Sequence, residues 1–212
     1  MTPGTFITLE GPDGSGKSSQ VPALVKAIEA AGYQVVSTRE PGGTEIGDQV
    51  RQVLMDLQNK SMHPRSEILL FQASRAQIVE EVIQPALAAG KVVLSDRYAD
   101  STLAYQGYGH QVDLSQLRRI VDFATGGLKP DLTLLFDLDA QEGLARRDSG
   151  GDWNRLDDYD LAFHQRVHAG YYQLVKEDPA RWRTINAAQP AEKVAQDLQQ
   201  TVLDFLAAQA SA

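Results

Sequence analysis

The stretch that decides the fold of this 212-residue chain is Gly11-Pro12-Asp13-Gly14-Ser15-Gly16-Lys17-Ser18. It fits the pattern G-x-x-x-x-G-K-[ST] of a phosphate-binding loop. The apolar run 6–9 before it reads as a buried strand, and 18–31 after it carries apolar residues at helical spacing. The glycines therefore lie at a strand-to-helix turn, where backbone N–H groups and a helix N-terminus can contact phosphate oxygens.

This loop predicts a site for a nucleoside triphosphate. Lys17 would neutralise the β- and γ-phosphates, and the hydroxyl of Ser18 would hold Mg²⁺. The alternative, a glycine turn followed by an exposed lysine, does not explain the strand and helix on either side. The residues expected to bind the donor are Gly11, Pro12, Asp13, Gly14, Ser15, Gly16, Lys17, Ser18 and Ser19.

Composition excludes several broad classes of protein. Asp and Glu number 28 against 20 Lys and Arg, so nucleic acid is not an expected partner. No apolar stretch reaches membrane-spanning length and the N-terminus lacks the features of a signal peptide, so we expect no membrane contact and a cytoplasmic location. The chain has no Cys and hence no disulfide or thiolate chemistry. His164 and His168 have i, i+4 spacing, but without a third ligand nearby a solvated or stacked pair is favoured over a metal site.

Strand-like and helix-like runs alternate along the chain, which predicts an α/β fold with a parallel sheet between two layers of helices. No linker divides the sequence, so we expect a single domain over 1–212. The predicted strands are 6–9, 34–38, 92–95, 132–136 and 183–185. The predicted helices are 18–31, 46–57, 64–89, 101–108, 114–125, 142–147, 156–176 and 191–208.

Polar residues follow the predicted strands at the sheet edge where ligands bind in such folds. Asp96 and Asp137 both end apolar strands, and either could accept a hydrogen bond from a Mg²⁺-bound water. Asp96 is favoured because Arg97 accompanies it, whereas Asp137 could equally cap its strand or the next helix. Arg39, Arg75 and Arg97 could converge on one anion, because Arg offers a bidentate fork to phosphate. They indicate a second phosphate site apart from the loop.

With these residues in view, the chain resembles the thymidylate kinase family, and its bacterial branch in particular. The resemblance covers nearly everything from Thr5 to Leu206. Its most specific marks, besides the loop, are Arg39-Glu40-Pro41-Gly42-Gly43-Thr44, Asp96-Arg97-Tyr98 and Tyr105-Gln106-Gly107. It implies a P-loop NTPase-like fold with a five-stranded parallel sheet, ATP with Mg²⁺ as donor, conversion of dTMP to dTDP, and a homodimer.

The resemblance also implies roles for single residues around dTMP. Asp13 would touch the sugar and phosphate surroundings, Phe71 would stack on thymine, and Tyr105 would form the wall against a ribose 2′-hydroxyl. On the residues alone, Phe71 and Tyr105 read as ordinary core packing. The contacts to the base edge would be Arg75, Thr102 and Gln106, and the phosphate ligands would be Arg39 and Arg97. The metal ligands expected from the loop pattern and the strand ends are Ser18 and Asp96.

The chain departs from the family pattern in the lid, the segment of about 146–157. Eukaryotic-type relatives place an Arg where Gly14 stands, and bacterial relatives compensate with lid arginines. Arg155 and Arg146 align with such arginines. The expected catalytic residues are these two arginines together with Asp13, Lys17 and Arg97. Arg147 is the next candidate, and Arg146 and Arg147 could instead be solvated helix charges. Ser149-Gly150-Gly151 indicates a mobile lid.

Two other protein classes share the phosphate loop. A GTP-binding switch needs Asn-Lys-x-Asp, but Asn59-Lys60 is followed by Ser61-Met62. A nucleotide-binding regulator without catalysis stays open as an alternative, and it would have to explain the second arginine cluster.

Overall fold

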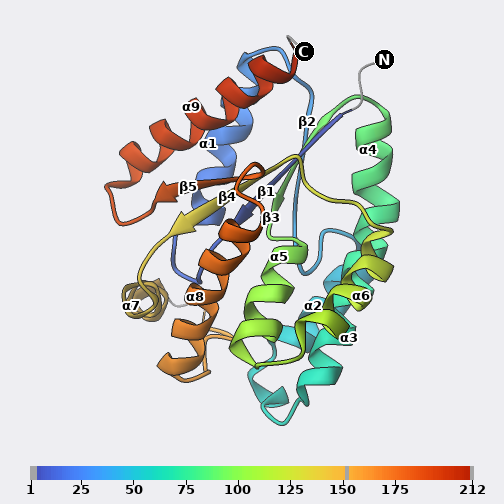
Figure 1. Cartoon of the computed structure of the whole chain (residues 1–212), viewed down its shortest axis with the longest axis vertical. Coiled ribbons are helices and arrows are strands. Elements are labelled where there is room, and N and C mark those ends of the chain that lie inside the picture. Colours follow the sequence, from blue (N-terminus) through green and yellow to red (C-terminus); the bar gives the residue numbers. More distant parts are fainter. Residues whose placement is uncertain (1–3, 151–152, 211–212) are drawn as a thin grey trace.

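A sheet of five parallel strands in the order β2-β3-β1-β4-β5 forms the centre of the protein (Figure 1). The computed structural model describes residues 4–150 and 153–210. The strands are β1 (Thr5–Glu10), β2 (Val35–Arg39), β3 (Val92–Asp96), β4 (Leu132–Asp137) and β5 (Trp182–Asn186). This confirms the expected α/β fold with a five-stranded parallel sheet.

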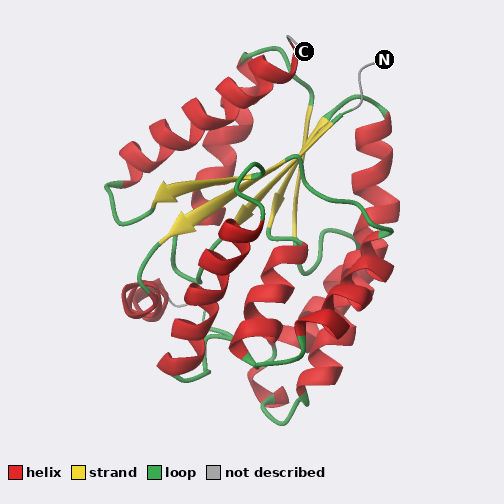
Figure 2. Ribbon diagram, viewed as in Figure 1, coloured by secondary structure: helices red, strands yellow, loops and turns green. Residues whose placement is uncertain are grey.

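Helices connect the strands and form a layer on each face of the sheet (Figure 2). Figure 1 shows α1 and α9 over one face and the remaining long helices, except the peripheral α7, over the other. The helices are α1 (Lys17–Ala30), α2 (Glu45–Met55), α3 (Pro64–Ile78), α4 (Gln84–Ala88), α5 (Ala99–Thr102), α6 (Leu114–Thr125), α7 (Ala140–Gly150), α8 (Leu161–Glu177) and α9 (Ala191–Ala210). Shorter segments are the 3₁₀ turn η1 (Leu57–Asn59) and the π-helical segments η2 (Val79–Ile83) and η3 (Leu103–Gly109).

The alternation of side chains along β1 explains why both faces carry a core. Ile7 and Leu9 are buried in a cluster that includes Leu24 of α1 and Leu198 of α9. Phe6 belongs to the cluster on the opposite face. Successive side chains of a strand point to opposite faces, so one strand contributes to two cores.

The strand ends bring the polar residues to one edge of the sheet. Asp96 is in register with both Leu9 of β1 and Arg39 of β2. The phosphate loop follows β1 directly, so it lies beside Arg39 and Asp96, as expected for ligand sites at the carboxyl ends of parallel strands.

Three predicted helices differ from the structure. Most of the helix expected over 101–108 is the π-helical segment η3, which continues from α5. The helix expected from residue 156 begins at Leu161, because Asp160 caps its first turn through Phe163 N at 2.7 Å. The helix expected over 64–89 contains the π-helical segment η2 between α3 and α4. A π-turn inserts one residue into the helical ladder, which a 3.6-residue periodicity does not reveal.

Candidate active site

The phosphate loop packs so closely against α7 that one of its glycines has no room for a side chain. Gly14 has φ +76°, and a Cβ atom there would lie 2.0 Å from the carbonyl oxygen of Gly143. Gly16, with φ +85°, stands at the N-cap of α1. An arginine at position 14 would therefore require movement of α7.

Lys17 lies within the loop and is 5 % exposed. Its Nζ donates to the carbonyl oxygens of Gly11 and Pro12 at 3.0 and 2.8 Å and to Ser15 Oγ at 3.1 Å. Burial and the nearby charge of Arg97 lower the pKa of Lys17 to about 8. The ammonium is therefore held at the loop in a position that favours an anionic partner.

The two aspartates considered for the metal have different neighbours. Ser18 Oγ donates a hydrogen bond to Asp96 Oδ2. Asp137 instead accepts from Tyr172 OH at 2.7 Å and lies 3.0 Å from His168 Nε2. Of the two carboxylates, Asp96 is the one that the structure joins to the loop.

Asp13 and Arg97 connect the loop to the strand end of β3. Arg97 Nη2 lies 2.7 Å from Asp13 Oδ1, and Tyr105 OH donates to Asp13 Oδ2 at 2.6 Å. Arg97 has φ +73°, a conformation that is uncommon for non-glycine residues. Although burial opposes its ionisation, the charges of Arg97 and Lys17 lower the pKa of Asp13 well below its usual range.

A buried carboxylate at the end of β1 supports this arrangement. Glu10 accepts hydrogen bonds from Tyr98 N at 2.9 Å, Ser101 Oγ at 2.6 Å and Tyr171 OH at 2.8 Å. Arg97 in turn donates to Ser101 Oγ at 3.0 Å. Burial and the neighbouring Asp100 raise the pKa of Glu10 to about 7.

Arg75 is held almost entirely by the protein. It is 1 % exposed and forms a buried ion pair with Glu40, in which Nη2 and Oε2 are 2.6 Å apart. Its Nη1 donates to Thr102 Oγ1 at 2.8 Å and to Gln72 Oε1 at 2.9 Å. The side chain borders the pocket with a fixed guanidinium.

The lid arginines have different surroundings. Arg147 Nη2 lies 2.8 Å from Asp157 and its charge acts on Asp13, whereas Arg146 Nη2 lies 2.6 Å from Glu142. Arg155 is 3 % exposed, with Nη2 2.6 Å from Glu67 Oε2 and Nε donating to the carbonyl oxygen of Leu54. Ser149 and Gly150 belong to the last turn of α7, and Gly151 of the predicted lid, with Asp152, lies outside the described residues.

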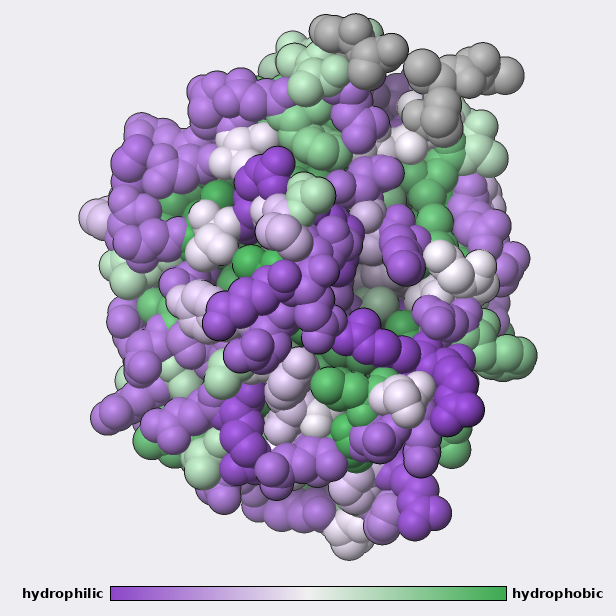
Figure 3. Space-filling view, in the orientation of Figure 1, coloured by the Kyte–Doolittle hydropathy of each residue, from purple (hydrophilic) through white to green (hydrophobic). Residues whose placement is uncertain are grey.

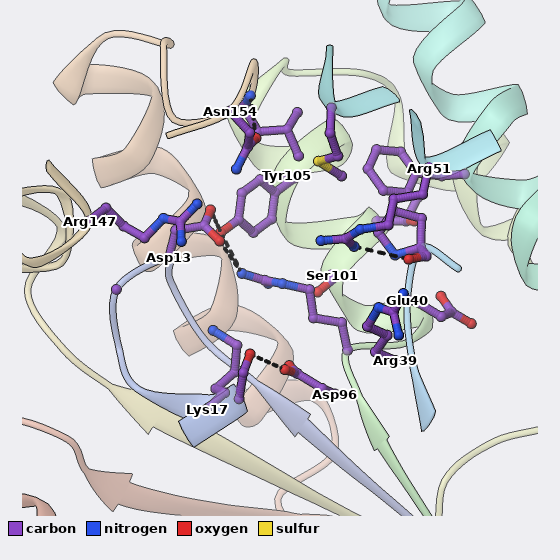
Figure 4. A pocket seen from close by; sticks show the side chains of 18 of the residues that line it. Asp13, Lys17, Arg39, Glu40, Arg51, Asp96, Ser101, Tyr105, Arg147 and Asn154 are labelled. Atoms are coloured by element: carbon purple, nitrogen blue, oxygen red, sulfur yellow. Dashed lines mark hydrogen bonds and ion pairs between the residues drawn. The ribbon is translucent and has the colours of Figure 1, made fainter. Parts of the chain in front are cut away.

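A single pocket gathers most of the residues predicted from sequence (Figure 4). Figure 4 shows Asp13, Tyr105 and Arg147 on one side of it, Arg39 and Arg51 on the other. The predicted residues that line it are Asp13, Gly14, Gly16, Lys17, Ser18, Ser19, Arg39, Phe71, Arg75, Asp96, Arg97, Thr102, Tyr105, Gln106 and Arg146. Gly11, Pro12 and Ser15 do not line the pocket but accept hydrogen bonds from Lys17. Arg155 does not line it either, and its guanidinium contacts the buried Glu67.

Sequence reasoning gave no role to several residues of this region. Arg51 lines the pocket and donates to the carbonyl oxygen of Pro41 at 3.0 Å, and Ser101 also lines it. Glu40 is a buried carboxylate paired with Arg75, and the buried Glu10 accepts from Ser101, which also contacts Arg97. The available signal was position, because Glu10 directly precedes the phosphate loop and Glu40 lies within the motif 39–44.

His164 and His168 have different neighbours and do not form a shared metal site. His168 contacts Asp137, while His164 is 2 % exposed and packs against the ring of Phe163. Within residues 4–150 and 153–210, no group of three or more His, Asp or Glu side chains could hold a metal by itself. In the same part of the chain, no helix combines the length and apolar character needed to cross a bilayer.

The sequence model of the family described as "Thymidylate kinase" matches residues 9–198. The chain belongs to the thymidylate kinase family. It is 50 % identical to a thymidylate kinase of Roseiflexus sp. (strain RS-1) over 214 residues, covering 95 % of both chains. It is 48 % identical to the thymidylate kinase of Deinococcus radiodurans, covering 92 % of this chain and 94 % of that one. The crystal structure of thymidylate kinase from Ehrlichia chaffeensis aligns with a TM-score of 0.77 at 33 % identity, covering 94 % of this chain and 99 % of that one.

Proposed function

We propose that this protein transfers the γ-phosphoryl group of ATP to dTMP, giving dTDP for dTTP synthesis. The observation that carries the proposal is the ion pair between Arg97 Nη2 and Asp13 Oδ1, which are 2.7 Å apart. It places a cation suited to binding the acceptor phosphate beside the donor loop, within one pocket. A nucleotide-binding switch or regulator binds no acceptor phosphate and so does not require Arg97 at this position. Phosphoryl transfer needs both substrates aligned and the charge on the transferring group neutralised.

The chemistry requires no general base. The attacking group is a phosphate oxygen of dTMP, which is already an anion, whereas a nucleoside hydroxyl would call for a carboxylate. Lys17 binds the β- and γ-phosphates, and Arg97 and Arg39 bind the acceptor phosphate. Asp13 orients Arg97 and borders the sugar. Its role is therefore to position these groups, and it transfers no proton.

Mg²⁺ is the expected metal, and Ser18 and Asp96 fit it. Both offer oxygen atoms, and their hydrogen bond places the hydroxyl and the carboxylate together beside Lys17. A Mg²⁺ ion held by these two residues would neutralise negative charge on the phosphates of ATP.

The thymine and deoxyribose contacts extend from the same pocket. Phe71 stacks on the base, and Arg75, Thr102 and Gln106 meet its edge. Tyr105 stands against the 2′ position of the sugar and is fixed there by its hydrogen bonds with Asp13 and Arg97. A 2′-hydroxyl would have to displace this ring.

For the lid, the geometry supports Arg147 and Arg146, which border the pocket, ahead of Arg155. The catalytic role predicted for Arg155 would require release of its contact with Glu67. We place the lid at 146–157 as part of a single domain over 1–212.

A homodimer is supported by apolar side chains on the outer side of two packed helices. Phe123 of α6 is 90 % exposed and Leu69 of α3 is 60 % exposed, and α3 packs against α6. Hydrophobic atoms interrupt the hydrophilic surface in the region of α3, α4 and α6 (Figure 3). Sedimentation of the wild type as a dimer and of Phe123→Lys as a monomer would support this face, and an unchanged dimer in the variant would exclude Phe123 from it. A cytoplasmic location stays a prediction.

A coupled ADP-release assay tests the activity. With ATP and Mg²⁺, we expect turnover with dTMP and at most a small fraction of it with water as the acceptor. Turnover that is equal with and without dTMP would identify an ATPase and overturn the proposal. Lys17→Ala, with unchanged circular dichroism, serves as the control that the activity belongs to this loop.

A further inference from the structure

A buried carboxylate beside the base edge has no part in the mechanism above. Glu67, on α3, is 0 % exposed. It contacts Gln106 of η3, which is 1 % exposed and lines the pocket. The Nε2 atom of Gln106 donates to Glu67 Oε1 at 2.7 Å. Glu67 therefore touches a residue that borders the substrate without bordering it itself.

The surroundings of Glu67 keep its carboxyl group ionised. Arg155 Nη2 lies 2.6 Å from Oε2, Tyr159 OH donates to Oε2 at 3.0 Å, and His110 Nε2 lies 3.2 Å from Oε1. Burial raises the pKa of Glu67, but the hydrogen bond with His110, the charge of Arg155 and the hydrogen bond from Gln106 outweigh it and lower the pKa to about 2. An ionised carboxylate accepts hydrogen bonds and donates none.

This state of Glu67 decides which way the Gln106 amide is turned. A glutamine amide has a carbonyl oxygen at one end and an NH₂ group at the other, and its shape alone does not choose between them. The carboxylate selects the NH₂ end, because a carbonyl oxygen facing it would leave two buried acceptors without a proton between them. The carbonyl oxygen of Gln106 is then the acceptor left for a ligand.

We propose that Glu67 determines base specificity by fixing the Gln106 amide so that its carbonyl oxygen meets the imide N–H of a thymine or uracil ring. Cytosine carries a lone pair on the corresponding ring nitrogen, so the same oxygen repels it. A turned amide would offer an N–H to that lone pair and reverse the preference. The inference rests on the proposed function and on the contact between Gln106 and the base edge.

The test replaces Glu67 by a side chain of the same size that can both donate and accept. In Glu67→Gln the Gln106 amide is free to turn, so the ratio of kcat/KM for dTMP over dCMP should fall by at least about tenfold relative to wild type. Tyr159→Phe is the matched control, because it removes another hydrogen bond to Glu67 and leaves Gln106 untouched. Its ratio should stay at the wild-type value.

A merely structural role for Glu67 would lower kcat/KM for both acceptors together. If the wild-type protein phosphorylates dTMP and a folded Glu67→Gln protein has an unchanged ratio of kcat/KM values, this inference alone is overturned. Absence of dTMP turnover by the wild type would instead overturn the proposed function.

A second measurement follows the ionisation of Glu67 in the wild-type protein by NMR. The ¹³Cδ resonance of Glu67 in the wild type should keep the chemical shift of a carboxylate down to pH 4.5, where an ordinary Glu is half protonated. Assignment can use the loss of this signal in Glu67→Gln or, if that variant does not fold, sequential connectivity. Protonation of Glu67 at the pH of the kinetic assay would overturn the proposal, because a protonated carboxyl could donate to the Gln106 carbonyl.

Discussion

Ser18 Oγ donates a hydrogen bond to the carboxylate of Asp96, 78 residues further along the chain. The first residue able to hold the metal thus comes from the start of α1 and the second from the end of β3. Parallel pairing of β1 with β3 brings them together, because it aligns Leu9 with Asp96. The sheet register is therefore the reason that the two residues proposed to hold the metal lie together.

Asp96→Asn should raise the Mg²⁺ concentration needed for half-maximal turnover at least about tenfold and lower kcat by roughly 10²-fold, because the neutral amide supplies less charge to the metal. Titration of activity with Mg²⁺ measures both effects. Asp137→Asn is the matched control, since Asp137 contacts His168 and Tyr172 instead of Ser18. Equal Mg²⁺ dependence in the two variants would remove Asp96 from the metal site.

Two variants separate the ring of Tyr105 from its hydroxyl. Tyr105→Ala should lower the preference for dTMP over ribothymidine monophosphate by at least about tenfold, because the wall at the 2′ position is lost. Tyr105→Phe should keep that preference, yet lose activity with both acceptors because the hydrogen bonds to Asp13 and Arg97 disappear. The readout is the ratio of kcat/KM values, and a preference unaltered by the alanine would place Tyr105 outside the sugar site.

The phosphate loop, the order of elements and the strand-end residues could be predicted from sequence because each depends on local pattern. Gly11 to Ser18 fixes a strand-to-helix turn, and the parallel sheet then brings residues after each strand to one edge. The position of Arg155 could not be predicted, because its contacts with Leu54 and Glu67 join segments about a hundred residues apart without any spacing rule. Glu10 adjoins the phosphate loop, but its hydrogen bonds with Ser101 and Tyr171 could not be predicted for the same reason.

Glu10 should make the stability of the protein depend on pH. Its pKa is raised from 4.5 to about 7 in the folded state, so the folded state binds the proton more tightly than the unfolded chain. The stability contributed by this group is complete below pH 4.5 and is lost as pH rises to about 7, an effect on the order of 3 kcal/mol. The unfolding free energy of wild type minus that of Glu10→Gln, measured in urea titrations, should therefore fall from pH 5 to pH 8. A rise of this quantity over the same range would contradict the raised pKa.

The lid arginines should separate into a catalytic and a structural group. Arg147→Ala should lower kcat by roughly 10²-fold with smaller changes in either KM, because its interaction with the transferring group is made mainly in the transition state. Arg155→Ala should chiefly lower stability, by about 3–5 kcal/mol, because it leaves Glu67 buried without its cation. Steady-state kinetics and urea unfolding of both variants distinguish the two effects. A large loss of kcat in a stable Arg155→Ala protein would restore Arg155 as the lid cation.

Transfer of a radioactive label tests the central claim most directly. With [γ-³²P]ATP, Mg²⁺ and dTMP, the separated products should contain labelled dTDP in the same molar amount as ADP, and Lys17→Ala should form neither at a comparable rate. Label recovered in inorganic phosphate, with dTMP unchanged, would contradict the claim that this pocket joins a triphosphate donor to dTMP.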